Sequence, residues 1–101
     1  SGAQGAATAS GDQGAATASG DRGAATASGT NNVAIAAGYE GKARANATGA
    51  IVLVCRKDPW DGGAILAIAA AKVGDAIGGV TIKPDTWYRL TSDGVAVEVE
   101  G

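Results

Sequence analysis

The chain has 101 residues, a formal net charge of −2, 17 glycines, two Trp and two Tyr, and it contains no Phe, Met or His. So few large apolar side chains exclude a conventional helical or sandwich core in the alanine-rich first half, where any interior has to be narrow and closely packed. The dispersed Lys and Arg residues form no basic stripe, and no apolar stretch approaches the roughly 20 residues that span a bilayer, so we expect neither nucleic-acid binding nor membrane insertion.

A nine-residue repeat fills the first half of the chain. Six consecutive units share one phase: 5–13, 14–22, 23–31, 32–40, 41–49 and 50–58. The third and fifth positions of each unit are apolar, from Ala7 and Ala9 in the first unit to Val52 and Val54 in the last. The position between them varies from Thr to Ile, Arg and Leu. This alternation predicts one short strand per unit, with the third and fifth side chains facing inward.

Each predicted strand is followed by a corner in which glycines flank polar residues, as in Gly11-Asp12-Gln13-Gly14. Glycine suits a corner where φ has to be positive. Two units, or eighteen residues, would complete one turn of a flattened two-sheet roll with alanines meeting inside. A three-faced winding needs a six-residue rhythm, which these columns do not follow. We therefore predict an all-β fold: a flattened parallel β-solenoid, or β-roll, over residues 1–49.

Residues 50–101 are predicted to form the last rung of the solenoid and a small antiparallel cap. The strand at 51–55 is apolar on both faces, so we expect both faces to be covered. Its Cys55 is a lone thiol, packed beneath the cap or bonded to another chain. A segment rich in turn formers, 57–63, predicts a hairpin. Its second arm, within 64–72, is predicted as a strand, with a short helix as the alternative.

The last part of the chain predicts further antiparallel strands. Residues 80–82 form a short strand, and Asp93-Gly94 predicts a hairpin between strands at 87–91 and 95–99. Open solenoid ends expose unpaired strand edges and an apolar interior. We expect this cap to cover them.

Two segments resemble known repeat proteins. Residues 33–43, Val-Ala-Ile-Ala-Ala-Gly-Tyr-Glu-Gly-Lys-Ala, resemble the head repeats of trimeric autotransporter adhesins, which have a longer period and Gly in place of Ala36. Residues 83–90, Lys-Pro-Asp-Thr-Trp-Tyr-Arg-Leu, are similar to a hairpin that ends β-solenoid repeat proteins of phage, prophage and gut bacteria. The resemblance implies a homo-oligomer, with a trimer favoured, and a location that is extracellular, on the cell surface or on the virion.

The first residues already follow the repeat. Ser1-Gly2 matches Ser10-Gly11 and Ser19-Gly20 in phase. We therefore expect the chain to be a piece of a longer repeat array.

We expect no enzyme activity, no cofactor and no metal site. The absence of His removes Ser–His and Cys–His pairs and the common zinc sites. Asp58 and Asp61 could act as catalytic carboxylates, but a role in the Pro- and Gly-rich turn explains both residues more simply. Nine-residue β-rolls can bind calcium at their corners, but here a unit offers one corner acid, Asp12 or Asp21, and later units lack it.

Aromatic residues are the candidate ligand contacts, because exposed rings stack on sugars or anchor partners. They are Tyr39, Trp60, Trp87 and Tyr88. The alternative for the two Trp residues and Tyr88 is to fill the core of the cap. Thr8, Thr17 and Thr26 could form a hydroxyl ladder for ice or polysaccharide, but Thr17 would face away in a two-sheet roll, which leaves the ladder short.

The pattern favours a structural and adhesive repeat module of a phage tail appendage or bacterial surface protein. The alternative is a carbohydrate- or ice-binding solenoid module, with a surface glycan as partner. Specific recognition is expected between Val33 and the C-terminus, while the segment 5–29 is expected to be a rigid spacer.

Overall fold

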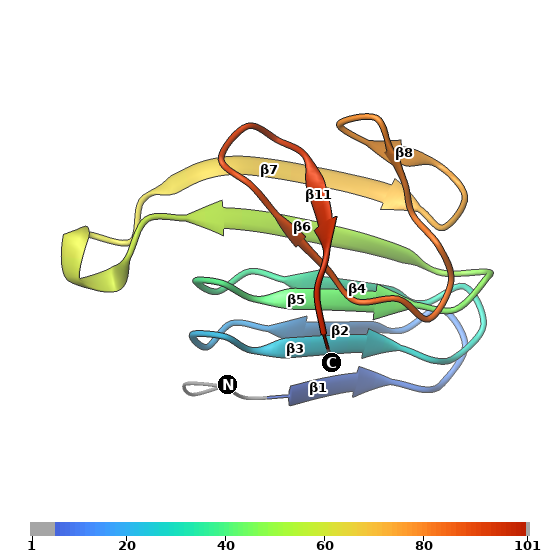
Figure 1. Cartoon of the computed structure of the whole chain (residues 1–101). Coiled ribbons are helices and arrows are strands. Elements are labelled where there is room, and N and C mark those ends of the chain that lie inside the picture. The colour runs from blue at the N-terminus through green and yellow to red at the C-terminus, as the bar shows by residue number, and fades with distance from the viewer. Residues whose placement is uncertain (1–5, 101) are drawn as a thin grey trace.

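The structure, a computed structural model, describes residues 6–100, so the predicted repeat phase at Ser1 and Gly2 lies outside the described residues. The predicted all-β class is confirmed (Figure 1). The strands are β1 (Ala6–Ala9), β2 (Ala15–Ala18), β3 (Ala24–Ala27), β4 (Val33–Ala36), β5 (Lys42–Ala45), β6 (Ala50–Arg56), β7 (Ile65–Lys72), β8 (Ala76–Ile77), β9 (Val80–Thr81), β10 (Tyr88–Leu90) and β11 (Ala96–Glu98). Within residues 6–100, no helix has the length and apolar character needed to cross a membrane.

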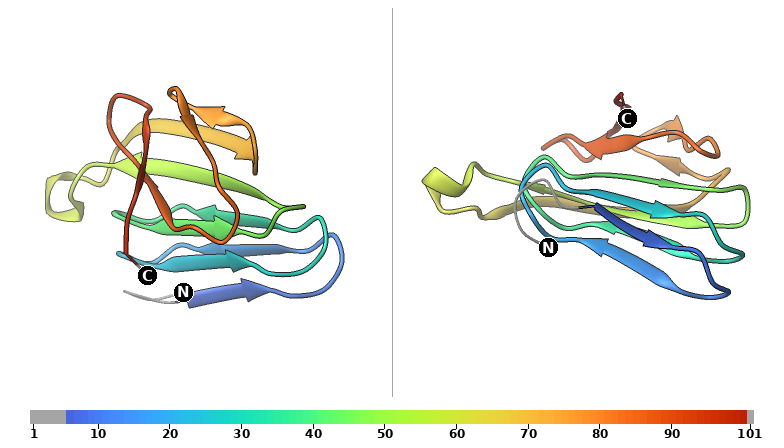
Figure 2. Two further views of the ribbon diagram at one scale, coloured as in Figure 1. Left: turned by 45° about the vertical axis from the view of Figure 1, so that its right-hand side comes forward. Right: turned by 90° about the horizontal axis from the view of Figure 1, so that it is seen from below.

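The strands form two mixed sheets and one small separate pair, β8 with β9. Sheet A has the order β1-β3-β5-β10-β11, and sheet B has the order β2-β4-β6-β7. The first six strands alternate between the sheets, which face each other as two layers (Figure 2). Each of them pairs in parallel with the strand two units away, as Ala25 does with Ala7 and with Ala43. The predicted eighteen-residue return to the same sheet is therefore confirmed for β1 to β5.

Alanine side chains fill the space between the two sheets. The predicted inward alanines of β2 to β5 are all buried: Ala16, Ala18, Ala25, Ala27, Ala34, Ala36, Ala43 and Ala45. At the C-terminal end the core continues in larger side chains: Ile51, Leu53, Ile77, Ile82, Tyr88 and Leu90. Burial contributes about 25 cal/mol per Å², so a single alanine adds little, and stability in the repeat region accumulates with the number of stacked strands.

The predicted inward positions of β6 are wrong by one residue. Ile51 and Leu53 are buried, whereas Val52 and Val54 are half-buried on the outer face of sheet B. The turn before β6, residues 46–49, has four residues where the earlier turns have five. Because side chains alternate along a strand, the lost residue moves each apolar side chain to the opposite face. The outer face of β6 is therefore only partly covered, whereas the sequence predicted that both faces would be covered.

The turns of the repeat use glycine for close approach rather than for positive φ. The left-handed residue is the last residue of each of the first four units: φ is 58° at Gln13, 56° at Arg22, 58° at Asn31 and 53° at Glu40. No glycine among residues 6–49 has positive φ, so this prediction for the corner glycines is wrong. A methyl group at Gly38 would collide with the carbonyl oxygen of Gly20 in the neighbouring turn. Glycine at this position lets successive turns stack.

One buried polar side chain, Asn32, replaces the glycine that begins the earlier units. Its Oδ1 accepts a hydrogen bond from the amide of Gly14 at 2.6 Å, and its Nδ2 donates to the carbonyl oxygen of Ala9 at 2.8 Å. Both of its polar atoms are therefore satisfied in the interior of the turn, as a buried amide requires.

β6 and β7 form a long antiparallel hairpin, so the predicted hairpin and the strand assignment of its second arm are confirmed. Its end contains a 3-10 turn, Pro59–Asp61. Figures 1 and 2 show this end projecting beyond the turns that join the shorter strands. β7 is the last strand of sheet B, and its Ile65, Leu66 and Ile68 are exposed.

The C-terminal segment adds antiparallel strands to sheet A. β10 pairs with β5 through Tyr88 and Ala43, and it pairs with β11 on its other side. The hairpin predicted at Asp93-Gly94 is thus confirmed, with φ of 81° at Gly94. β9 occupies the strand predicted at 80–82. Antiparallel strands extend both sheets at the same end of the molecule (Figure 1).

Candidate functional site

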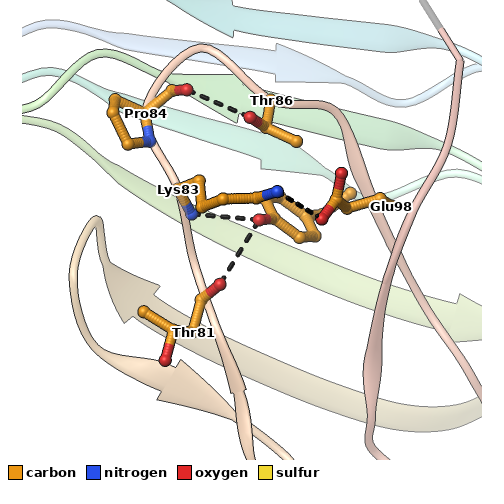
Figure 3. A network of polar contacts seen from close by, with 6 residues as sticks. Thr81, Lys83, Pro84, Thr86 and Glu98 are labelled. Atoms are coloured by element: carbon orange, nitrogen blue, oxygen red, sulfur yellow. Dashed lines mark hydrogen bonds and ion pairs between the residues drawn. The ribbon is translucent and has the colours of Figure 1, made fainter.

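The four predicted contact residues lie in three different environments. Tyr88 is fully buried, and its hydroxyl accepts a hydrogen bond from the amide of Lys83 at 3.0 Å and donates to the carbonyl oxygen of Thr81 at 3.3 Å. Figure 3 shows this network, in which the Lys83 ammonium also pairs with Glu98 at 2.7 Å. Tyr88 is therefore a core residue that holds the segment crossing over it, which was the alternative expected for it.

Trp87 lies on the outer face of sheet A, half-buried between two cations. The Nζ atom of Lys42 lies 4.9 Å from the ring centroid, and the guanidinium carbon of Arg44 lies 4.5 Å from it. Both distances fall in the range of cation–π interactions. Lys42 also donates to the carbonyl oxygen of Glu100 at 2.8 Å. The Trp87 ring is thus engaged by neighbours within the chain.

Tyr39 and Trp60 lie together on the edge where the β6–β7 hairpin projects. Both line a hollow of about 170 Å³, with Asp21, Arg22 and Asp58 around it. This hollow lies between two repeat turns and the tip of the hairpin. That Tyr39 and Trp60 contact a ligand stays a prediction, and the structure places both residues at one hollow.

A second hollow of about 350 Å³ adjoins the first and shares Asp21, Tyr39 and Pro59 with it. We call the two hollows together the corner groove. The residues with side chains that line it are Ser19, Asp21, Arg22, Ala37, Tyr39, Arg56, Asp58, Pro59 and Trp60. The backbone at Gly38, Gly62 and Gly63 forms part of the wall. Small-molecule sites are clefts of roughly 300–1,000 Å³, so the groove has the size of a ligand site.

Arg56 fastens the hairpin to the neighbouring turn. Its Nε donates to the carbonyl oxygen of Ala37 at 2.6 Å, and its Nη1 donates to the carbonyl oxygen of Gly63 at 3.1 Å. Such charge-assisted hydrogen bonds are stronger than neutral ones. The two walls of the corner groove are therefore held at a fixed separation.

The tip of the hairpin is equally ordered. The Asp58 carboxylate accepts a hydrogen bond from the amide of Trp60 at 2.8 Å and so caps the 3-10 turn. Lys57 and Asp61 form an ion pair at 3.5 Å. Both acids therefore have roles in the turn, as the sequence interpretation favoured.

The charges on the groove are of both signs. Arg22 pairs with Glu40 at 3.2 Å, and Asp21 and Asp58 line the same hollow as Arg22. Desolvation, followed by the negative charges of Glu40 and Asp58, raises the pKa of Tyr39 above its ordinary value of 10.0. The Tyr39 hydroxyl therefore keeps its proton at neutral pH.

The described residues give little support for metal binding or for a hydroxyl ladder. Within residues 6–100, no group of three His, Cys, Asp or Glu side chains is placed to hold a metal ion. Thr8 and Thr26 pair in sheet A, while Thr17 pairs with Ile35 in sheet B. The next residue in the sheet A column is Arg44, so the aligned hydroxyls end after two strands.

Sequence reasoning missed the polar half of the corner groove. Asp21, Arg22 and Arg56 were not predicted as site residues, because nothing in the repeat shows that the hairpin returns to this edge. One signal could have placed Asp21 and Arg22 near Tyr39. Alternate units put their turns on opposite edges, so turns 19–23 and 37–41 share one edge and turns 10–14 and 28–32 share the other. Comparison of the chain with protein-family models, with curated proteins and with solved structures gives no match.

Proposed function

We propose that the chain is a structural and adhesive repeat module of a phage tail appendage or a bacterial surface protein, and that its repeat region is a flattened β-solenoid. The observation that carries this proposal is the in-register parallel pairing of strands two units apart. A coil of identical short strands gives a rigid body whose length depends on the number of units. Such a body serves as a spacer or a display surface outside the cell or on the virion.

Residues 50–101 are proposed to be the last rung and the cap of this solenoid. β6 and β7 complete sheet B, and β10 and β11 complete sheet A, so the antiparallel strands occupy the edge on which another parallel rung would pair. The larger core residues of this region cover the end of the alanine column. This arrangement supports a role in covering the open end of the alanine core, and it leaves β7 as the outermost strand of sheet B.

The module is proposed to act as a homotrimer. Support comes from β7, an edge strand with three exposed large apolar residues and no charge between Ile65 and Ala71. Natural edge strands usually carry charges or proline that prevent pairing with another chain. An unprotected edge of this kind is suited to contact with a second copy.

Light scattering on the whole chain tests the trimer. We expect three times the mass of one chain, and we expect Ile68→Lys to reduce the mass to that of one chain, because a charge on the edge strand opposes its burial. Thr81→Lys, at an exposed position outside β7, is the control and should leave the trimer intact. A wild-type monomer contradicts the trimer and weakens the adhesive-module proposal.

Glycan recognition is a second candidate function, favoured by the corner groove with its two aromatic residues and mixed charges. Ice binding has no comparable support, since the aligned threonines extend over two strands. A glycan array separates the candidates. Binding to a defined class of glycans supports recognition, whereas no binding leaves the structural role as the proposal.

A further inference from the structure

Trp60 is the most exposed large hydrophobic residue among the described residues, at 98% of its full accessible surface. Leaving an indole in water forgoes the gain from burying an aromatic surface, and exposed aromatic residues of this kind anchor binding partners. The feature therefore calls for a partner that covers it.

The indole is presented by a rigid turn. Pro59 restricts the backbone before it, and the Asp58 carboxylate accepts from the Trp60 amide at 2.8 Å. The amides of Asp61 and Gly63 donate to the carbonyl oxygen of Asp58 at 2.8 and 3.2 Å. This backbone is already ordered in the folded chain, so binding at Trp60 costs little further backbone entropy.

Hydrogen-bonding groups lie around the same hollow as the ring. Asp21 and Asp58 provide carboxylate acceptors, and Arg22 provides guanidinium donors. Tyr39 lines the same hollow. A ligand in this hollow meets an aromatic surface on one side and both donors and acceptors on the others.

Charge indicates which ligands fit. The corner groove has two carboxylates, Asp21 and Asp58, and two guanidinium groups, Arg22 and Arg56, so its charges balance. An anionic ligand therefore meets the two carboxylates and a cationic one meets the two guanidinium groups, so neither sign of charge is favoured. A neutral molecule with one apolar face and many hydroxyl groups can stack on the aromatic ring and form hydrogen bonds with both the carboxylates and the guanidinium groups.

We propose that the corner groove binds a neutral pyranose unit of a glycan, which stacks on Trp60 and forms hydroxyl hydrogen bonds with Asp21, Asp58 and Arg22. The adjoining hollow of about 350 Å³, lined partly by backbone at Gly38, Gly62 and Gly63, holds the next sugar unit. This inference rests on glycan recognition, the second candidate function, and it specifies the ligand class and the residues.

The test is titration calorimetry of the whole chain with three sets of oligosaccharides. The sets are neutral hexose and N-acetylhexosamine oligomers, uronate oligomers, and cationic glucosamine oligomers. We expect binding by a member of the neutral set, with an affinity that salt changes little, because no net charge is neutralised. Stronger binding of the uronate or glucosamine set overturns the neutral-ligand assignment.

Trp60→Ala is the decisive variant. Its ring makes no buried contact, so the fold should be unaffected, and the affinity should fall at least about tenfold, as for a central aromatic anchor. Thr81→Ala is the control, at an exposed residue outside both the groove and the β7 edge, and it should keep the wild-type affinity.

The remaining outcomes separate this inference from the function on which it rests. If a glycan binds equally well to the wild type and to Trp60→Ala, glycan recognition stands and the corner groove is the wrong site. If no member of any set binds, both the recognition function and this site are rejected. If Trp60→Ala reduces the oligomer mass in light scattering without any effect on sugars, Trp60 is a contact between protomers, and the inference is rejected.

Discussion

At the scale of single residues, the turns place two different demands on neighbouring positions. The last residue of a unit adopts the left-handed conformation, yet it is Gln, Arg, Asn or Glu in four successive units. The glycine two residues before it has an ordinary φ but no room for a side chain, as at Gly29 and Gly38. Stacking of turns, rather than backbone conformation, therefore requires glycine in this repeat.

Substitution at equivalent glycines tests this account. Gly38→Ala should lower the free energy of unfolding by about 1–3 kcal/mol, the usual cost of forcing an extra carbon into a filled site. A methyl group at Gly11, the same position of the first unit, meets no atom within 4 Å, so Gly11→Ala is the matched control and should change stability by less than about 0.5 kcal/mol. Urea denaturation measures both, and equal effects would contradict the role assigned to stacking.

At the scale of elements, β6 shows how one turn determines which residues form the core. The four-residue turn at 46–49 sets Ile51 and Leu53 inward. Leu53→Ala should therefore cost about 2–5 kcal/mol, as truncation in a filled core does. Val52→Ala, on the outer face, should cost less than about 1.5 kcal/mol. Chemical denaturation of the two variants checks the register, and the reverse order of effects would restore the register expected from an unbroken nine-residue period.

The sequence predicted elements well where copies could be compared, and poorly where a single copy stood alone. The alanine columns from Ala16 to Ala45 identified both the strands and their inward faces, because six units repeated the same alternation. In β6 the strand is apolar on both faces, so its pattern could not reveal that the preceding turn was one residue short. The turn residues Asn46-Ala47-Thr48-Gly49 contain the difference, but only the strand pairing makes its effect visible.

The corner groove was predictable only in part for a similar reason. Tyr39 and Trp60 stood out by residue type, and Tyr88 did so equally, although it is buried. What separates them is the path of the chain: the hairpin returns Trp60 to the edge of Tyr39, and β10 turns Tyr88 into the core. Contacts between segments that occur once in the sequence leave no periodic trace, so neither the groove nor the role of Arg56 could be derived from the pattern.

At the scale of the whole molecule, stability should depend on the number of repeat units. Duplicating residues 14–22 once and then twice adds strands that contact only their neighbours, so each addition should raise the free energy of unfolding by a similar increment. A scrambled nine-residue insertion of the same composition is the control and should lower it, because it interrupts the alanine column. Denaturant unfolding gives the three values, and a loss of stability on the first correct duplication would contradict a stack of interchangeable units.

The constant interior and the variable turn ends together have an evolutionary consequence. Gln13, Arg22, Asn31 and Glu40 occupy one backbone conformation with four different side chains, while the alanines between them do not change. New surface chemistry can therefore arise by single substitutions at fixed spacing, without any adjustment of the core. Arg22 and Glu40 already show the result on the groove edge, where two copies of the same position have diverged into an ion pair. Duplication followed by divergence at the turns would let this architecture acquire new specificities while keeping its frame.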